Sequence, residues 1–191
     1  MHRVLIACSA LLALGLLSTG CARQGEVAAM VAPVTPETEF ATNSFLRDTI
    51  ALGTVTGAGS SASLLEEQVT DTALREALAR SLERHGLRYG AGDRFTLDVR
   101  MVGIEDRPLF ESLTVLGRFE YVMRGPQRQI VFDEIIATPF TPEITASLFG
   151  PANRAILAEG SVRASIDEFL FRLRRDAQLN PIRFTLALPQ P

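Results

Sequence analysis

Three successive segments between residues 95 and 136 alternate apolar and polar side chains, and this alternation constrains the possible folds most strongly. Their apolar positions are Phe95, Leu97, Val99 and Met101; then Leu113, Val115, Phe119, Tyr121 and Met123; then Ile130, Phe132 and Ile136. A two-residue period is typical of β-strands that bury one face. Gly125-Pro126-Gln127-Arg128 predicts a tight hairpin, and Glu105-Asp106-Arg107-Pro108 predicts the start of a longer turn. We therefore expect an antiparallel meander.

Two other segments predict helices. In the first, Thr70 or Asp71 can cap the N-terminus and Gly86 can end the helix. Its apolar positions are Leu74, Ala77, Leu78 and Leu82. The second helix begins near Pro151 and carries an apolar stripe of Ala155, Ala158, Val162, Ile166, Phe169 and Leu173. Each helix thus has one face to bury.

Polar residues and a glycine add detail to the second helix. Arg172, Arg174 and Arg175 suit the negative end of its dipole. Glu159 and Arg163 are spaced to pair on its polar side. Gly160 costs about 1 kcal/mol relative to alanine in a helix, which indicates a close approach to the sheet.

The order of these elements predicts the fold class. A strand over residues 45–55 precedes the first helix, and residues 182–188 alternate in a way that can add an edge strand. The order is then β-α-β-β-β-α with a possible extra C-terminal strand. We expect an α+β fold, with a mostly antiparallel four-stranded sheet and two helices on one face.

The N-terminus predicts an export signal. A short basic start, His2 and Arg3, precedes an apolar stretch from Val4 to Leu17. At roughly 14 residues, this stretch is shorter than the roughly 20 that cross a hydrocarbon core as a helix. Leu17-Ser18-Thr19-Gly20-Cys21 resembles the lipobox of bacterial lipoproteins, although Leu17 lies four rather than three residues before the cysteine. Residues 1–20 are expected to be a lipoprotein signal peptide.

Cysteine usage agrees with lipidation of Cys21. The only other cysteine, Cys8, lies in the predicted signal, so the mature chain can form no internal disulfide. A diacylglyceryl group and an amide-linked chain such as palmitate would cap the thiol and anchor the chain to a bilayer. Ala22 stands where an inner-membrane retention signal has Asp, which favours the periplasmic face of the outer membrane. The alternative is an ordinary signal peptide with an incidental Cys21.

The remaining chain divides into a tether and one domain. Residues 21–43 are small and polar, with Pro33 and Pro36, and predict a lipidated flexible tether. Residues 44–191 predict a single periplasmic domain. All 19 basic residues are arginine and the net charge is −3. No basic cluster is interleaved with aromatic residues, so a nucleic-acid partner is not expected.

The motifs that can carry chemistry are sparse. Gly57-x-Gly59-x-x-Ala62 follows a strand, but the βαβ units of a dinucleotide fold do not follow it, so it predicts a loop. His85, the one histidine after the predicted signal, is placed to cap the first helix. We expect no metal site and no cofactor, because structural zinc sites use several Cys and His ligands.

Acidic residues and loop residues offer two further candidates. Asp98, Glu105, Asp106, Glu111 and Glu120 can supply a pair of carboxylates, as glycoside hydrolases need, or solvated charge on polar strand faces. The second role is the default for such positions, and no catalytic residue is assigned. Gly150-Pro151-Ala152-Asn153-Arg154 and the patch of Leu109 and Phe110 can mark a partner site or pack under the second helix.

Three segments resemble those of a known group of proteins. They are Val55-Thr56-Gly57, Val69-Thr70-Asp71 through Ala73-Leu74-Arg75-Glu76-Ala77-Leu78, and Arg154-Ala155-Ile156-Leu157-Ala158-Glu159-Gly160-Ser161-Val162-Arg163-Ala164-Ser165-Ile166. They resemble small alphaproteobacterial envelope lipoproteins that carry the automatic name UDP-N-acetylglucosamine acyltransferase. The hexapeptide repeats of true acyltransferases of that name do not occur here. The layout is also similar to lipoproteins that assist lipopolysaccharide assembly or serve envelope ABC transporters.

These observations favour a membrane-anchored, non-catalytic accessory or assembly factor of the cell envelope. Its expected partners are the bilayer, through acylated Cys21, and an envelope protein complex. A carrier of a lipid or small apolar ligand is the alternative, and would need a cavity between sheet and helices. An enzyme of envelope glycan or lipid metabolism is another, and would need convergent polar groups around a cleft.

Overall fold

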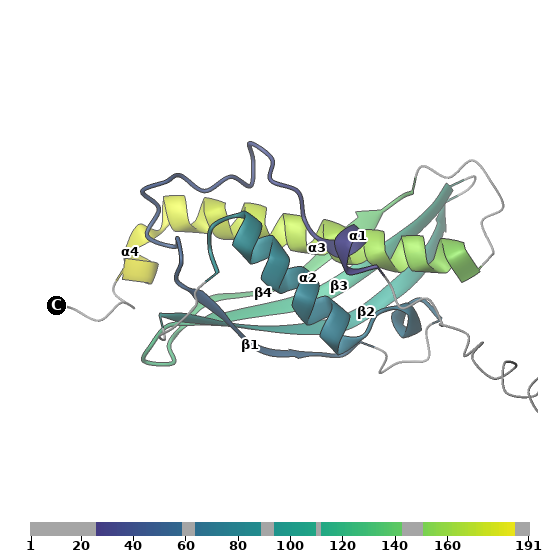
Figure 1. Ribbon diagram of the computed structural model, residues 1–191, viewed down its shortest axis with the longest axis horizontal. Coiled ribbons are helices and arrows are strands. Elements are labelled where there is room, and N and C mark those ends of the chain that lie inside the picture. Colours follow the sequence, from purple (N-terminus) through teal and green to yellow (C-terminus); the bar gives the residue numbers. More distant parts are fainter. Residues whose placement is uncertain (1–25, 59–63, 89–93, 110–111, 143–150, 186–191) are drawn as a thin grey trace, which may run out of the picture.

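Four strands form one sheet in the order β1-β2-β3-β4 (Figure 1). The computed structural model describes residues 26–58, 64–88, 94–109, 112–142 and 151–185. The strands are β1 (Ile50–Thr56), β2 (Phe95–Leu109), β3 (Ser112–Arg124) and β4 (Ile130–Phe140). The helices are α1 (Val27–Met30), α2 (Asp71–Arg84), α3 (Pro151–Leu179) and α4 (Pro181–Thr185), with a 3-10 turn, η1, at Glu66–Gln68. The predicted α+β class is confirmed.

The predicted meander is present in β2, β3 and β4, whose two pairings are antiparallel. Arg128, at φ +63°, donates its backbone N–H to the Gly125 carbonyl across 2.9 Å in the predicted hairpin. Residues 105–108 are strand rather than the expected start of a turn, because β2 and β3 stay paired as far as Leu109 and Ser112. Since β1 pairs with β2 only as far as Arg100, no described strand pairs with that side of the later part of β2, and such edges tolerate proline.

The pairing of β1 adds one parallel pair to the mostly antiparallel sheet that was predicted. β1 lies parallel to β2, with Ile50 opposite Phe95 and Thr56 opposite Arg100. The sheet is therefore mixed rather than purely antiparallel. A strand–helix–strand crossover through α2 returns the chain in its original direction, whereas a short hairpin reverses it. The apolar pattern of β1 is the same in both cases.

Helices α2 and α3 lie on the same face of the sheet, as predicted (Figure 1). Thr70 caps α2, because its Oγ1 accepts a hydrogen bond from the Ala73 backbone N–H at 3.1 Å. Gly86, at φ +66°, follows the helix. The expected close approach at Gly160 is also confirmed, because a Cβ there would lie 2.1 Å from Cζ of Phe140.

The charged residues of α3 have other partners than predicted. The helix continues to Leu179, so none of Arg172, Arg174 and Arg175 is in its last turn. Arg174 donates to the backbone carbonyl of Glu37 at 2.8 Å. Glu159 is buried and accepts from the backbone N–H of Glu26 at 2.6 Å, while the Arg163 guanidinium lies 5.9 Å from the ring centre of Phe140. The predicted Glu159–Arg163 pair is replaced by these contacts.

The segment before β1 packs into the domain, which corrects the tether prediction for residues 26–43. Five of its side chains are buried: Met30, Val31, Ala32, Thr38 and Phe40. α1 packs against both α2 and α3. The backbone N–H of Ala32 donates to Ser81 Oγ of α2 at 3.0 Å. We name residues 26–43 the N-terminal arm. Its small and polar composition did not predict burial, because a few apolar side chains suffice to fill the space between two helices.

Residues 182–185, the described part of the predicted edge strand, lie in a helix instead. α4 spans Pro181–Thr185, and proline is favoured in the first turn of a helix. Phe184 is fully buried, with ring centres 5.7 Å from Phe45 and 6.2 Å from Phe95. Residues 186–191 lie outside the described residues.

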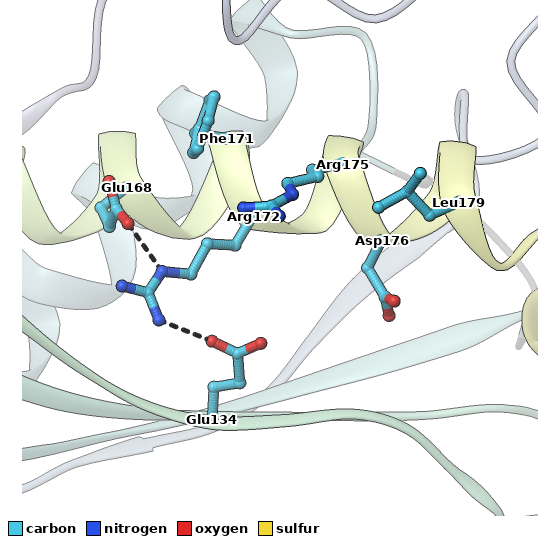
Figure 2. Close-up of a pocket in the computed structure, with 7 residues that line it drawn as sticks. All are labelled: Glu134, Glu168, Phe171, Arg172, Arg175, Asp176 and Leu179. Atoms are coloured by element: carbon cyan, nitrogen blue, oxygen red, sulfur yellow. Dashed lines mark hydrogen bonds and ion pairs between the residues drawn. The ribbon is translucent and has the colours of Figure 1, made fainter.

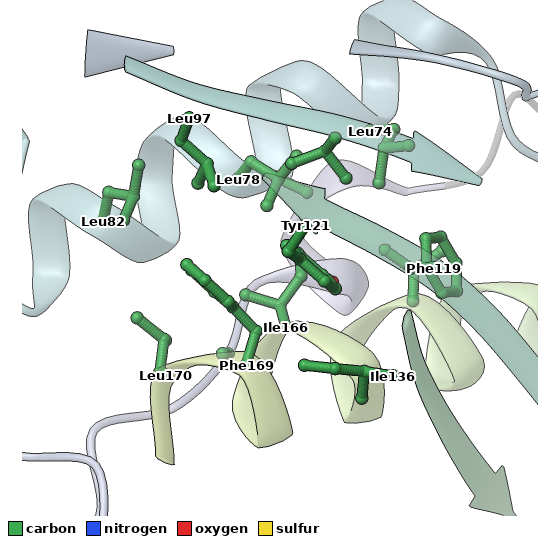
Figure 3. Close-up of a cluster of buried hydrophobic side chains, with 14 of the residues drawn as sticks. Leu74, Leu78, Leu82, Leu97, Phe119, Tyr121, Ile136, Ile166, Phe169 and Leu170 are labelled. Carbon is green, nitrogen blue, oxygen red and sulfur yellow. The ribbon is translucent and has the colours of Figure 1, made fainter. Parts of the chain in front are cut away.

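Aromatic side chains at the centre of the core join the sheet to α3 (Figure 3). Tyr121 of β3 and Phe169 of α3 stack with ring centres 4.4 Å apart, and Phe132 meets Phe169 edge-on at 5.5 Å. The Tyr121 hydroxyl lies 2.9 Å from Ser165 Oγ. This buried hydroxyl is thus hydrogen-bonded, as buried polar groups require.

Burial raises the pKa of Tyr121, with the Ser165 hydrogen bond opposing the shift in part. A group whose folded pKa exceeds its unfolded value of about 10 contributes its full stability below that pH and loses it as the pH rises further. We predict that Tyr121 ionises only when the domain unfolds at alkaline pH. The chain has two tyrosines and no tryptophan, so phenolate absorbance with circular dichroism measures this directly. Tyr121→Phe should remove the increase in phenolate absorbance that coincides with unfolding. Ionisation of both tyrosines in the native fold would contradict the prediction.

Candidate functional site

A surface groove lies where α3 overhangs the edge strand β4 (Figure 2). Its volume is about 370 Å³, and it is lined by Glu134, Glu168, Phe171, Arg172, Arg175, Asp176 and Leu179. We name it the β4–α3 groove. β4 is the last strand of the sheet and pairs only with β3 among the described strands. Edge strands are surfaces to which other chains can bind.

Arg172 connects the two sides of the groove. Its Nε donates to Oε1 of Glu168 at 2.6 Å, and its Nη1 donates to Oε2 of Glu134 at 2.9 Å (Figure 2). These hydrogen bonds raise the pKa of Arg172. Because one guanidinium holds a carboxylate on the helix and another on the strand, the polar wall of the groove is preorganised.

The other groove residues supply exposed apolar surface and a free charge. Phe171 is 36% exposed and Leu179 is 67% exposed. Asp176 accepts from Asn180 Nδ2 at 2.7 Å and lies 3.5 Å from Arg183 Nη1. Within the described ranges, Arg175 makes no ion pair. The site thus combines apolar contact area with an arginine that is free to bind an acidic group.

A second groove lies at the opposite edge of the sheet, between β1 and α2. It measures about 440 Å³ and is lined by Ala51, Leu52, Thr72, Arg75, Glu76, Ala79 and Arg88. Arg75 donates to the backbone carbonyl of Gly53 in β1. A side chain of the protein itself therefore already occupies part of this edge, which favours the β4–α3 groove as the binding site.

The described candidate carboxylates pair with arginines rather than with one another. Three are held by arginines: Asp98 by Arg124, Glu120 by Arg100, and Glu105 by Arg118. Asp98 also accepts from the backbone N–H of Thr54 at 2.7 Å. The residues that alternate with Asp98, Leu97 and Val99, are buried, which places Asp98 on the sheet face away from the core. The side chains of Asp106 and Glu111 lie outside the described residues.

His85 follows α2 at the predicted cap position and is buried. Its Nδ1 lies 2.7 Å from the Ser81 carbonyl, and its Nε2 lies 3.2 Å from Thr38 Oγ1 of the N-terminal arm. It therefore holds the arm against α2. In the part of the chain that the structure describes, no group of three or more His, Cys, Asp or Glu side chains can hold a metal ion.

The remaining predicted site residues have other places than the expected loops or lie outside the described residues. Residues 151–154 form the first turn of α3, and Leu109 ends β2. Gly57 follows β1 at φ +98°, where a Cβ would lie 2.3 Å from the Met101 carbonyl oxygen. A glycine is thus required for backbone geometry. Gly59, Ala62, the Phe110 side chain and Cys21 are not described, so the lipidation site stays a prediction.

The sequence reasoning missed the β4–α3 groove. Its signal was available in Phe171 and Leu179, because both are apolar and lie off the buried stripe of α3. Glu134 carried no such signal. Its proximity to Arg172 depends on how the helix crosses the sheet, which the periodicity does not specify.

The fold and groove define an α+β domain with a surface site beside an edge strand. No protein-family model matches the chain, and no curated protein matches it in sequence. One structure that matches is protein XCC0632 from Xanthomonas campestris, described with the family model DUF330. The two are 12% identical with a TM-score of 0.46, over 59% of this chain and 65% of that one. This chain therefore spans less than two thirds of that structure, and the function is argued from the geometry.

Proposed function

We propose that this chain is a lipid-anchored accessory protein of the cell envelope that binds a partner protein in the β4–α3 groove. The observation that carries the proposal is the exposure of Phe171 and Leu179 beside the preorganised Arg172 ion pairs. Apolar anchors next to ordered charge are typical of protein-binding sites. The partner segment would carry an apolar side chain for Phe171 and Leu179, and an acidic group for Arg175.

The anchor in this proposal is acylated Cys21, on the periplasmic face of the outer membrane. The lipobox-like sequence and the resemblance to envelope lipoproteins support it. The described residues include no helix with the length and apolarity to cross a bilayer.

The packing of the core favours an accessory role over a carrier role. A carrier needs a cavity between sheet and helices. That space holds fully buried side chains from both layers, among them Leu74, Leu78, Tyr121 and Phe169 (Figure 3). An apolar ligand would have to displace them, at a cost in close-packed contacts. Among the described residues, the candidate carboxylates Asp98, Glu105 and Glu120 are each held by an arginine, which supports the accessory role over the enzyme alternative.

The test is photo-crosslinking in intact cells. A photoreactive residue at position 175 probes the groove, and one at position 34, where Val34 is 48% exposed, serves as the control. We expect a discrete adduct from position 175 that depends on Cys21. The double variant Phe171→Ser with Leu179→Ser should weaken binding about tenfold or more, since apolar anchors carry much of the binding energy. Val34→Ser should leave the adduct unchanged. Recovery of the protein alone, or an equal adduct in the double variant, would refute the proposal.

A further inference from the structure

The point at which the chain enters the domain is held in place by buried contacts. Glu26, the first described residue, donates its backbone N–H to the buried carboxylate of Glu159 on α3. Met30, at the end of α1, is fully buried. Since α1 also packs against α2 and α3, the start of the arm has a defined place on the surface.

The distance from this point to the anchor is short. Cys21 precedes Glu26 by five residues, which span at most about 18 Å even when fully extended. A flexible tether ending at residue 43 would have allowed several times that distance. With residues 26–43 packed in the domain, an acyl group on Cys21 holds the surface around Glu159 close to the lipid headgroups.

Two exposed apolar side chains belong to α3 and to the segment before η1, which packs against α3. Ile156 is 45% exposed and lies three residues before Glu159, on a neighbouring position of the helix surface. Leu64 is 53% exposed and lies just before η1. η1 packs against α3, and its Glu66 accepts from the backbone N–H of Ile104 at 2.9 Å. We name Glu26, Leu64 and Ile156 the anchor end.

We infer that the anchor end lies against the surface of the bilayer, with Leu64 and Ile156 in contact with the headgroup region. The inference rests on the proposed lipidation. Transfer of exposed apolar residues to the membrane interface is favourable. The short connection from Cys21 also keeps them near this interface.

This orientation sets the position of the groove. Arg175 lies 19 residues beyond Ile156 on the continuous helix α3, which corresponds to about 28 Å along the axis. The partner would be engaged at up to that distance beyond the lipid surface. The domain thus acts as a spacer of limited height.

The test uses acylated full-length protein in vesicles of phosphatidylethanolamine and phosphatidylglycerol. Spin labels are placed on Leu64→Cys or Ile156→Cys at the anchor end, and on the control variants Ile135→Cys or Ile182→Cys, whose native side chains are 57% and 68% exposed. We expect accessibility to an aqueous nickel chelate to fall several-fold at positions 64 and 156 when the protein binds vesicles. The controls should not change.

Two negative results are distinguishable. Vesicle-bound, acylated protein whose labels at positions 64 and 156 stay as accessible as the controls would overturn the orientation while leaving the anchor intact. A chain without acyl mass at Cys21 that does not float with vesicles would overturn the proposed anchoring, and the orientation with it.

Discussion

A version of the protein that begins at residue 44 is expected not to fold, whereas one that begins at residue 26 should keep the native structure. The first removes the whole N-terminal arm, including the buried side chains Met30, Val31 and Phe40. Burying a side chain of that size contributes about 1.5–3 kcal/mol. Because a typical domain is stable by only about 5–15 kcal/mol, the loss of several such side chains consumes most of the margin.

The lost hydrogen bonds act in the same direction. Without the arm, Glu159 of α3 loses its contact with the Glu26 N–H, and His85 loses Thr38. A buried polar group left without a partner costs about 1–3 kcal/mol. Circular dichroism and thermal unfolding of the two versions provide the measurement. A cooperative transition at an unchanged temperature in the version that begins at residue 44 would show that the arm is dispensable.

Phe169→Ala is expected to lower the free energy of unfolding by about 3–5 kcal/mol, the range for large-to-small changes of buried phenylalanine. Phe169 is fully buried, stacks on Tyr121 at 4.4 Å and meets Phe132 at 5.5 Å. Its removal would leave a cavity between α3 and the sheet, and both remaining rings would lose their main contact.

Phe171→Ala is the matched control, because the same substitution is made two residues later on the same helix. Phe171 is 36% exposed and lines the β4–α3 groove. Surface substitutions of this kind change stability by about 0.5 kcal/mol. Urea unfolding of both variants measures the difference. Equal destabilisation would mean that the burial of the two rings differs less than the structure indicates. Only Phe171→Ala should weaken partner binding without a large loss of stability.

Local patterns predicted many of the elements. The meander, the cap at Thr70, the buried stripe of α3 and the close approach at Gly160 follow from residue periods and from the properties of single residues. The polar wall of the β4–α3 groove was not predictable in this way. Glu134 and Arg172 are 38 residues apart, and only the packing of α3 on β4 brings them together.

The sequence by itself determined the elements whose burial pattern repeats over short distances. These are three strands with a two-residue period and two helices with an apolar stripe, together with the hairpin at Gly125. The tertiary structure decided the rest. The parallel direction of β1, the burial of the N-terminal arm, the helix at Pro181 and the groove all depend on contacts between segments distant in the chain. Residues 30–40 contain few apolar side chains, so in isolation the segment looks like a tether. Its apolar side chains belong to the core only because α2 and α3 leave a space between them that these side chains fill.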